Sequence, residues 1–147
     1  MKAITHRHRE RKEETKPETT HRHLERKKKI MPQEIEVWYL IPALRRELAK
    51  IFIKDYSFTQ KKSAEILGIT NAAISQYLSS KRGEKINFKE KEVKEIKKSA
   101  EKIIKKNGNL IKELYDLCVS LRKSKIICDM HRRQDQNILE DCDICFK

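Results

Sequence analysis

The cysteines are the residues of this 147-residue sequence whose type and spacing most directly suggest chemistry. All four lie in the last thirty residues, and together with one histidine they form the pattern C-x9-C-x2-H-x10-C-x2-C. A C-x2-C pair projects two sulfur atoms toward one ion, so this pattern favours metal binding over a disulfide framework in a cytosolic chain. The surrounding segment is short and polar, and we expect it to need a bound metal in order to fold. The residues of the pattern are Cys118, Cys128, His131, Cys142 and Cys145.

Two occupants fit this pattern. Four thiolates satisfy an iron–sulfur cluster, which Cys118, Cys128, Cys142 and Cys145 would hold. The alternative is tetrahedral zinc, with His131 as a ligand in place of Cys118. The uneven spacing is less typical of a zinc knuckle and favours the cluster. Cys118 taken singly is equally compatible with a small buried hydrophobic residue on the apolar face of a helix.

An enzyme is the alternative from another class. Cys142 and Cys145 could form a thiol–disulfide redox pair, but the pair lies two residues from the end of the chain and lacks the βαβ context that such chemistry uses. The sequence contains no recognisable hydrolase triad, phosphate-binding loop or paired carboxylates. We therefore expect a binding protein and not an enzyme.

A second group of residues predicts a helix-turn-helix over residues 59–82. Thr59 is placed to cap one helix, and Gly68 supplies the left-handed conformation that ends it. Thr70 is placed to cap a second helix, from Asn71 to about Ser79. Small and apolar residues stand where the two helices would pack on each other: Ala64, Ile69, Ile74, Tyr77 and Leu78.

The outer face of the second helix is suited to reading base edges in DNA. Asn71, Ala72, Ser75 and Gln76 are short or carry amides, so they permit close approach to the bases. Basic residues flank the motif, where phosphate contacts usually fall. The flanking set is Lys61, Lys62, Lys81 and Arg82, and Thr70 is counted with the DNA-binding residues at the start of the helix.

The run Gln60-x3-Ala64-x3-Gly68-Ile69-Thr70-x3-Ile74-Ser75-Gln76-Tyr77-Leu78 resembles the helix-turn-helix of the lambda-repressor-like (Cro/XRE) regulators. Over residues 34–83, and more loosely at the C-terminus, the chain is similar to a group of archaeal predicted transcriptional regulators. In that group the domain precedes a short cysteine-bearing tail. The resemblance implies that Gln60, Asn71, Ala72, Ser75 and Gln76 face DNA, and that the cysteines form one site used across the group.

Composition agrees with a polyanionic partner. The formal net charge is +13, with 39% charged and 37% hydrophobic residues, which favours double-stranded DNA. RNA is a weaker alternative, because only 6% of residues are aromatic and no stacking platform is evident. No apolar run approaches the ~20 residues of a membrane span, and no signal peptide opens the chain. We therefore expect a cytoplasmic protein with no membrane partner.

These groups imply an all-α chain in four parts. Residues 1–30 carry eleven Lys or Arg against five Glu and contain two His-x-His pairs, which indicates a disordered basic arm more than a metal site. Residues 31–86 form the helix-turn-helix domain, with a helix that starts at Pro42. Residues 87–123 form amphipathic helices, and residues 124–147 form the Cys-rich metal-bound tail.

The amphipathic helices carry two apolar stripes, separated by Asn107-Gly108. The first stripe is Phe88, Val93, Ile96, Ala100, Ile103 and Ile104; the second is Leu110, Ile111, Leu114, Leu117, Cys118 and Leu121. The stripes either complete the core of one chain or pair two chains. Most helix-turn-helix proteins bind as pairs across two half-sites, which favours a homodimer. The sequence thus predicts a sequence-specific transcriptional regulator that senses redox, iron or sulfur state through its tail, or one whose zinc is purely structural.

Overall fold

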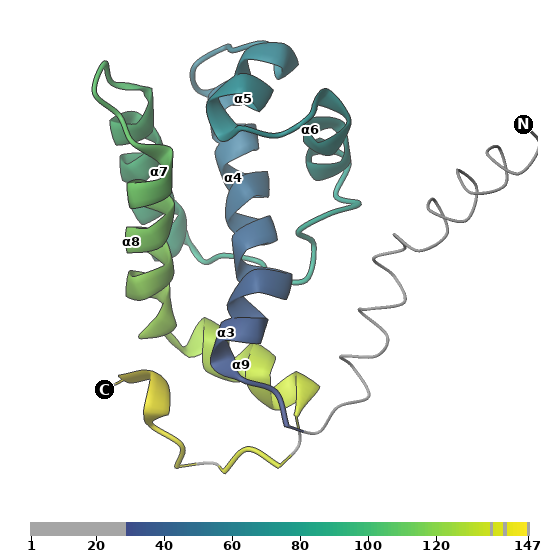
Figure 1. Cartoon of the computed structure of the whole chain (residues 1–147), viewed down its shortest axis with the longest axis vertical. Coiled ribbons are helices and arrows are strands. Elements are labelled where there is room, and N and C mark those ends of the chain that lie inside the picture. The colour runs from purple at the N-terminus through teal and green to yellow at the C-terminus, as the bar shows by residue number, and fades with distance from the viewer. Residues whose placement is uncertain (1–28, 136, 140, 147) are drawn as a thin grey trace, which may run out of the picture.

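One helical path of changing pitch runs through the middle of the molecule. It consists of α3 (Pro32–Ile35), the π-helical turn η1 (Glu36–Leu40) and α4 (Ile41–Lys54), which follow one another without a break (Figure 1). The computed structural model describes residues 29–135, 137–139 and 141–146, and the described elements are helices without a strand. The all-α prediction is confirmed for these residues. The predictions for the basic arm fall almost entirely on residues 1–28, outside the described residues.

The start of this path differs from the prediction. The α-helical segment α4 does begin beside Pro42, but helical backbone already begins at Pro32. A proline has no N–H to donate, and its ring crowds the carbonyl four residues earlier. The π-turn accommodates this, because the N–H of Ile41 donates to the carbonyl of Glu36, five residues back. Pro42 therefore marks a change of pitch and not the start of the helix.

The two short helices after α4 have the predicted caps. Thr59 accepts a hydrogen bond from the backbone of Lys62 and begins α5 (Gln60–Leu67). Gly68 follows with φ +65°, in the left-handed region. Thr70 accepts from the backbone of Ala73 and begins α6 (Asn71–Leu78). Ala64 and Ile74 are buried, and α5 and α6 pack on each other and on α4 (Figure 1).

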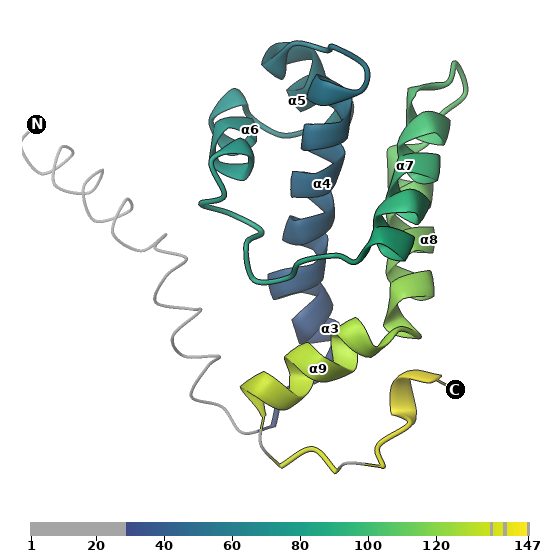
Figure 2. The same ribbon diagram turned by 180° about the vertical axis from the view of Figure 1, so that it is seen from behind.

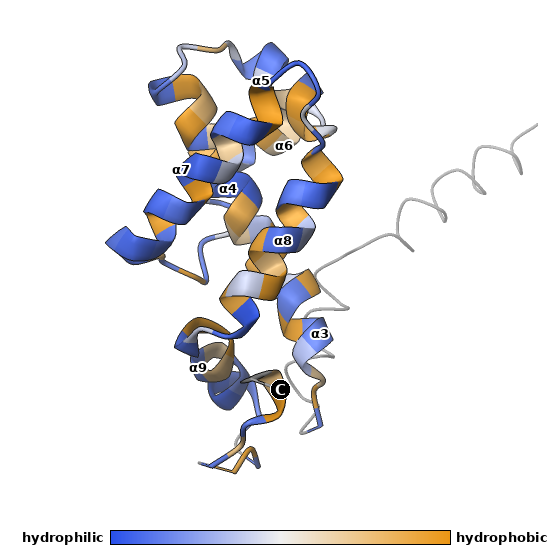
Figure 3. Ribbon diagram, turned by 90° about the vertical axis from the view of Figure 1, so that its left-hand side faces the viewer, coloured by the Kyte–Doolittle hydropathy of each residue, from blue (hydrophilic) through white to orange (hydrophobic). Residues whose placement is uncertain are grey.

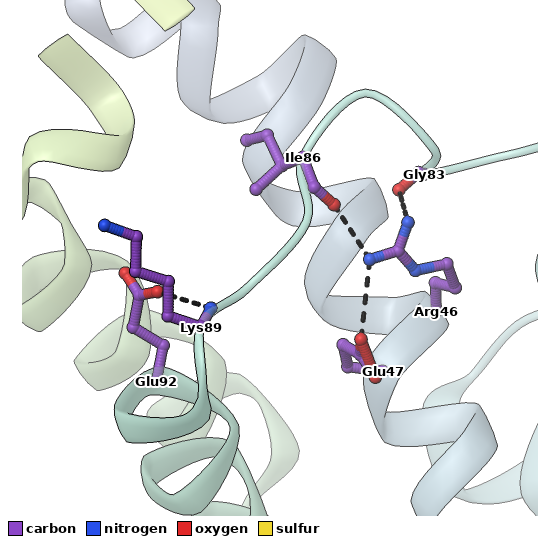
Figure 4. Close-up of polar contacts among 6 residues, drawn as sticks. All are labelled: Arg46, Glu47, Gly83, Ile86, Lys89 and Glu92. Carbon is purple, nitrogen blue, oxygen red and sulfur yellow. Dashed lines mark hydrogen bonds and ion pairs between the residues drawn. The ribbon is translucent and has the colours of Figure 1, made fainter. Parts of the chain in front are cut away.

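A buried arginine holds the segment that leaves α6. The guanidinium of Arg46 on α4 donates to the carbonyl of Gly83, and at 2.8 Å to that of Ile86 (Figure 4). Gly83 has φ +71°, and a Cβ there would lie 2.6 Å from the carbonyl oxygen of Pro42. Only glycine therefore allows the loop to lie this close to α4. Arg46 is 4% exposed, so the Ile86 carbonyl receives a charged donor away from solvent, and the Gly83 carbonyl receives one in a partly buried position.

The lysine-rich segment forms an antiparallel pair, α7 (Glu90–Ile104) and α8 (Leu110–Arg122), on the opposite side of α4 from α6 (Figures 1 and 2). At the start of α7 the Glu92 carboxylate accepts from the N–H of Lys89 at 2.8 Å (Figure 4). Hydrophilic and hydrophobic bands alternate along both helices (Figure 3). Most residues of the two apolar stripes join the core of this chain, although Ile111 is 73% exposed. The stripes therefore do not require a second copy, and the homodimer stays a prediction.

The last helix closes the end of the molecule away from α5. α9 (Lys125–Gln134) packs against α3 and α8, and a short tail ending in the 3-10 turn η2 (Ile144–Phe146) follows it (Figure 2). An ion pair joins α8 to η1, with Arg122 donating to the Glu36 carboxylate at 2.8 and 3.2 Å. One hydrophobic core runs from Ile30 to Met130. No helix in the described ranges is long and apolar enough to cross a membrane.

Candidate nucleic-acid interface and cysteine pocket

The outward face of α6 carries the predicted reading residues. Asn71, Ala72 and Ser75 are exposed, and because successive helical residues are about 100° apart they share one side of the helix. The opposite side packs inward through Ala73, Ile74 and Tyr77. The exposed side is thus lined by short side chains, and a flat or grooved partner can approach the helix backbone closely.

Gln76 lies at the edge of this face. Its side chain is half-buried, and its Oε1 is buried without a hydrogen-bond partner among the described residues. It borders a groove of about 700 Å³ between α6, the loop that follows it, and the path of η1 and α4. The lining is aromatic and basic and includes Trp38, Arg45, Tyr77, Lys81, Arg82 and Lys85. The structure therefore brings Gln76 together with Lys81 and Arg82, beside the three exposed residues of α6.

The start of α5 adds a second exposed basic edge. Gln60 and Lys61 are exposed, and the ammonium of Lys62 lies 4.2 Å from the centroid of the Phe58 ring. Thr70 is exposed too, but its hydroxyl oxygen is already used as the α6 cap. Thr70 therefore has a structural role whether or not it contacts a partner.

The cysteines are divided between two places. Cys128 on α9 and Cys142 and Cys145 in the tail line one pocket of about 160 Å³, together with His131. Apolar neighbours such as Ile30, Pro32 and Ile138 complete the lining. Burial raises the pKa of the Cys145 thiol, and the neighbouring Cys128 and Cys142 raise it further. Three of the four cysteines and the predicted alternative ligand are thus brought together.

Cys118 lies outside this pocket. It is 8% exposed on the inner side of α8, beside the ion pair of Glu36 and Arg122. Burial raises the pKa of its thiol to about 11; the Glu36 carboxylate adds to this, whereas Arg122 and Arg45 oppose it. This environment matches the interpretation of Cys118 as a small buried residue.

Comparison with protein-family models, with curated proteins and with solved structures gives no match to this chain. The helix-turn-helix resemblance therefore stays an expectation, and the function is inferred from the chain's own residues.

The donor sets of the two predicted occupants fit the pocket differently. An iron–sulfur cluster usually takes four thiolates, whereas three cysteines line the pocket and Cys118 does not. Three thiolates and one imidazole form a common tetrahedral zinc set. No three His, Cys, Asp or Glu side chains within the described ranges already converge as a metal-binding group. The pocket thus suits zinc better than a four-cysteine cluster, and its ligands would have to draw together on the ion.

Nothing in the sequence predicts the two polar contacts that hold the backbone of Ile30, which we call the clamp on Ile30. His131 Nε2 hydrogen-bonds to the Ile30 carbonyl, and the Ile30 N–H donates to the Asp135 carboxylate at 3.2 Å. His131 and Asp135 are both buried. These contacts join residues about one hundred positions apart, where spacing carries no information. The aromatic part of the groove lining, which includes Trp38, was equally unforeseen.

The raised pKa of Cys118 predicts slow alkylation. At pH 8 in folded protein treated with a chelator, its thiolate fraction should be about a hundredfold below that of an ordinary thiol with a pKa of 9.0. The pKa is raised, so the thiol stays protonated until the pH approaches about 11. Mass-spectrometric mapping of iodoacetamide adducts against time measures this directly. Unfolding in urea should remove the protection, and equal rates in the two states would contradict the assignment.

Proposed function

We propose that this chain is a sequence-specific DNA-binding regulator of transcription, in which α5 and α6 act as a helix-turn-helix. The observation that carries the proposal is the exposed face of α6. Its side chains are short and polar or small, no described element covers them, and the helix is fixed from behind by the core. Such a helix fits the major groove of B-DNA, which admits an α-helix and displays a distinct pattern for each base pair.

In this proposal α6 lies in the major groove, with Asn71, Ala72 and Ser75 facing base edges. Lys81 and Arg82, in the loop after α6, contact backbone phosphates, as Lys61 does from the start of α5. The bonds from Arg46 hold the backbone of this loop at Gly83 and Ile86, just after the two cations. A net charge of +13 supplies the long-range attraction to the duplex.

Two substitutions separate base contacts from phosphate contacts. Asn71→Ala should relax sequence preference, because the exposed Asn71 amide can pair with adenine in the major groove, whereas the Gln76 Oε1 is buried. Lys81→Ala should weaken binding to all sequences alike and lower the salt slope of log K by about one. The measurement is selection of bound sites from random duplexes, followed by affinity titrations at several salt concentrations.

Lys98→Ala provides the matched control, since Lys98 is an exposed lysine of α7, away from the proposed interface. It should leave both preference and salt slope close to those of the parent. If Asn71→Ala and Lys81→Ala also behaved as the parent does, α6 and its loop would not be the DNA-contacting surface.

The homodimer is the second part of the proposal. Two copies of α6 would read half-sites about one helical turn apart, or a multiple of that spacing. Selected sites should then be inverted or direct repeats with constant spacing. Single, unrepeated sites would instead indicate a monomeric regulator.

Regulation through the tail is the third part. An iron–sulfur cluster would make the protein responsive to redox, iron or sulfur state. The lining of the cysteine pocket, with three thiols and an imidazole, supports the zinc alternative instead. DNA binding by α6 does not depend on which of the two occupies the tail.

A further inference from the structure

We propose that Cys128, His131, Cys142 and Cys145 form a tetrahedral zinc site, that His131 binds the ion through Nδ1, and that Cys118 is not a ligand. The first observation is the shared pocket. Cys128 and His131 are three residues apart on α9 and so lie on one face of it, whereas Cys142 and Cys145 reach the same pocket from the tail. The proposed site lies at the end of the molecule formed by α9 and the tail, and the inference does not depend on DNA binding.

The hydrogen bond from His131 selects its metal-binding nitrogen. A backbone carbonyl can only accept, so Nε2 of His131 carries the proton and donates to the carbonyl of Ile30. The neutral ring then has its lone pair on Nδ1. Metal-binding histidines characteristically donate their other N–H to a carboxylate or a backbone carbonyl, which fixes the tautomer and the orientation of the ring. His131 has this arrangement.

A second hydrogen bond holds the backbone of Ile30, which makes the position of the carbonyl that His131 contacts rigid. Its N–H donates to the Asp135 carboxylate at 3.2 Å, and its side chain is 5% exposed in the core. The Asp135 carboxylate also accepts from the N–H of Asn137 at 3.0 Å, at the beginning of the tail. The end of α9 therefore fixes the segment before α3 and the first residues of the tail together. A buried histidine with this support loses little freedom when it binds an ion.

Cys118 does not line the pocket that the other three cysteines and His131 share, which leaves it out of the proposed ligand set. The Glu36 carboxylate and the Arg122 guanidinium, which bond to each other at 2.8 Å, act on the thiols of both Cys118 and Cys145. Three thiolates and one imidazole nitrogen are left to hold the ion. That set is typical of structural zinc, whereas clusters usually take four cysteines.

Metal binding is expected to complete the fold of the tail. The four side chains line the pocket without forming a ready-made group in the described parts of the chain. Zinc sites in small domains draw their ligands together on binding, and the binding free energy becomes folding free energy. The tail buries little apolar surface, because Leu139 and Ile144 are 70% and 67% exposed.

X-ray absorption at the zinc edge of the full-length protein, loaded with one equivalent of zinc, tests the ligand set. We expect three sulfur ligands at about 2.3 Å and one nitrogen at about 2.0–2.1 Å. Cys118→Ala and Cys142→Ala form a matched pair. The first should bind zinc as the parent does, whereas the second should lose affinity by more than the ~10–100-fold typical of losing a residue that only orients a ligand. Far-ultraviolet circular dichroism checks that both variants keep their helices.

Four sulfur ligands, or loss of zinc in Cys118→Ala with the helices intact, would overturn the proposal. Iron and sulfide in protein purified without oxygen, with broad visible absorption, would overturn it in favour of a cluster. A failure to bind zinc in the parent would remove the site altogether. None of these measurements involves DNA, so each leaves the proposed function of α6 to its own tests.

Discussion

Arg46→Met is expected to lower the free energy of unfolding by about 2–5 kcal/mol. The guanidinium donates to the carbonyls of Gly83 and Ile86, and a buried acceptor left without its donor costs about 1–3 kcal/mol. Methionine fills a similar volume, so a cavity would contribute little to this loss. Lysine should not rescue the variant, because a single ammonium lacks the planar fork that serves two carbonyls.

Urea unfolding followed by circular dichroism measures this loss, and Arg45→Met is the matched control. Arg45 is the preceding residue on α4, but it is half-exposed on the wall of the groove. The same chemical change there should cost less than about 1 kcal/mol, as surface changes usually do. Equal destabilisation by the two variants would mean that the loop after α6 is held by something other than Arg46.

Ala72→Glu is expected to lower DNA affinity about a hundredfold or more. Ala72 is exposed in the first turn of α6, where the proposed interface needs a short side chain. A carboxylate there would meet the phosphates and the electronegative groove, and a like-charge contact of this kind costs several kcal/mol. The fold should not suffer, because a negative charge near a helix N-terminus is favourable.

Fluorescence anisotropy with a selected duplex measures the effect, and Ser120→Glu is the control. Ser120 is an exposed, short residue on α8, so its replacement changes the net charge by the same amount far from α6. It should reduce affinity only slightly, through long-range charge. Parent-like binding by Ala72→Glu would show that α6 does not enter the groove.

The local features of α5 and α6 could be predicted because caps are local chemistry. A threonine hydroxyl reaches an N–H three residues on, and a glycine at φ +65° ends a helix, so a short window of sequence carries the signal. The exposure of Asn71, Ala72 and Ser75 follows from the same periodicity. The sequence therefore predicted the two capped helices and the exposure of these three residues, whereas it placed the half-buried Gln76 on the same face.

The features that were missed depend on distant partners or on conflicting local signals. Pro42 usually marks the first turn of a helix, and only the π-turn at η1 lets it stand inside a longer path. Arg46 looks like one more surface cation in the sequence, since its carbonyl partners lie 37 and 40 positions away. Spacing left Cys118 open as either a ligand or a buried residue, whereas packing buries it on α8 and leaves it out of the pocket that the other three cysteines line.

The clamp on Ile30 also has a consequence for the order in which the protein is made. Ile30 precedes His131 by 101 positions and Asp135 by 105. At synthesis rates of about 5–20 residues per second, Ile30 leaves the ribosome roughly 5–20 s before its partners. The helices that carry the candidate reading face lie wholly between them and can form during that interval. The nascent chain can therefore form α5 and α6 first, and it secures the entry to α3 only after His131 and Asp135 have emerged.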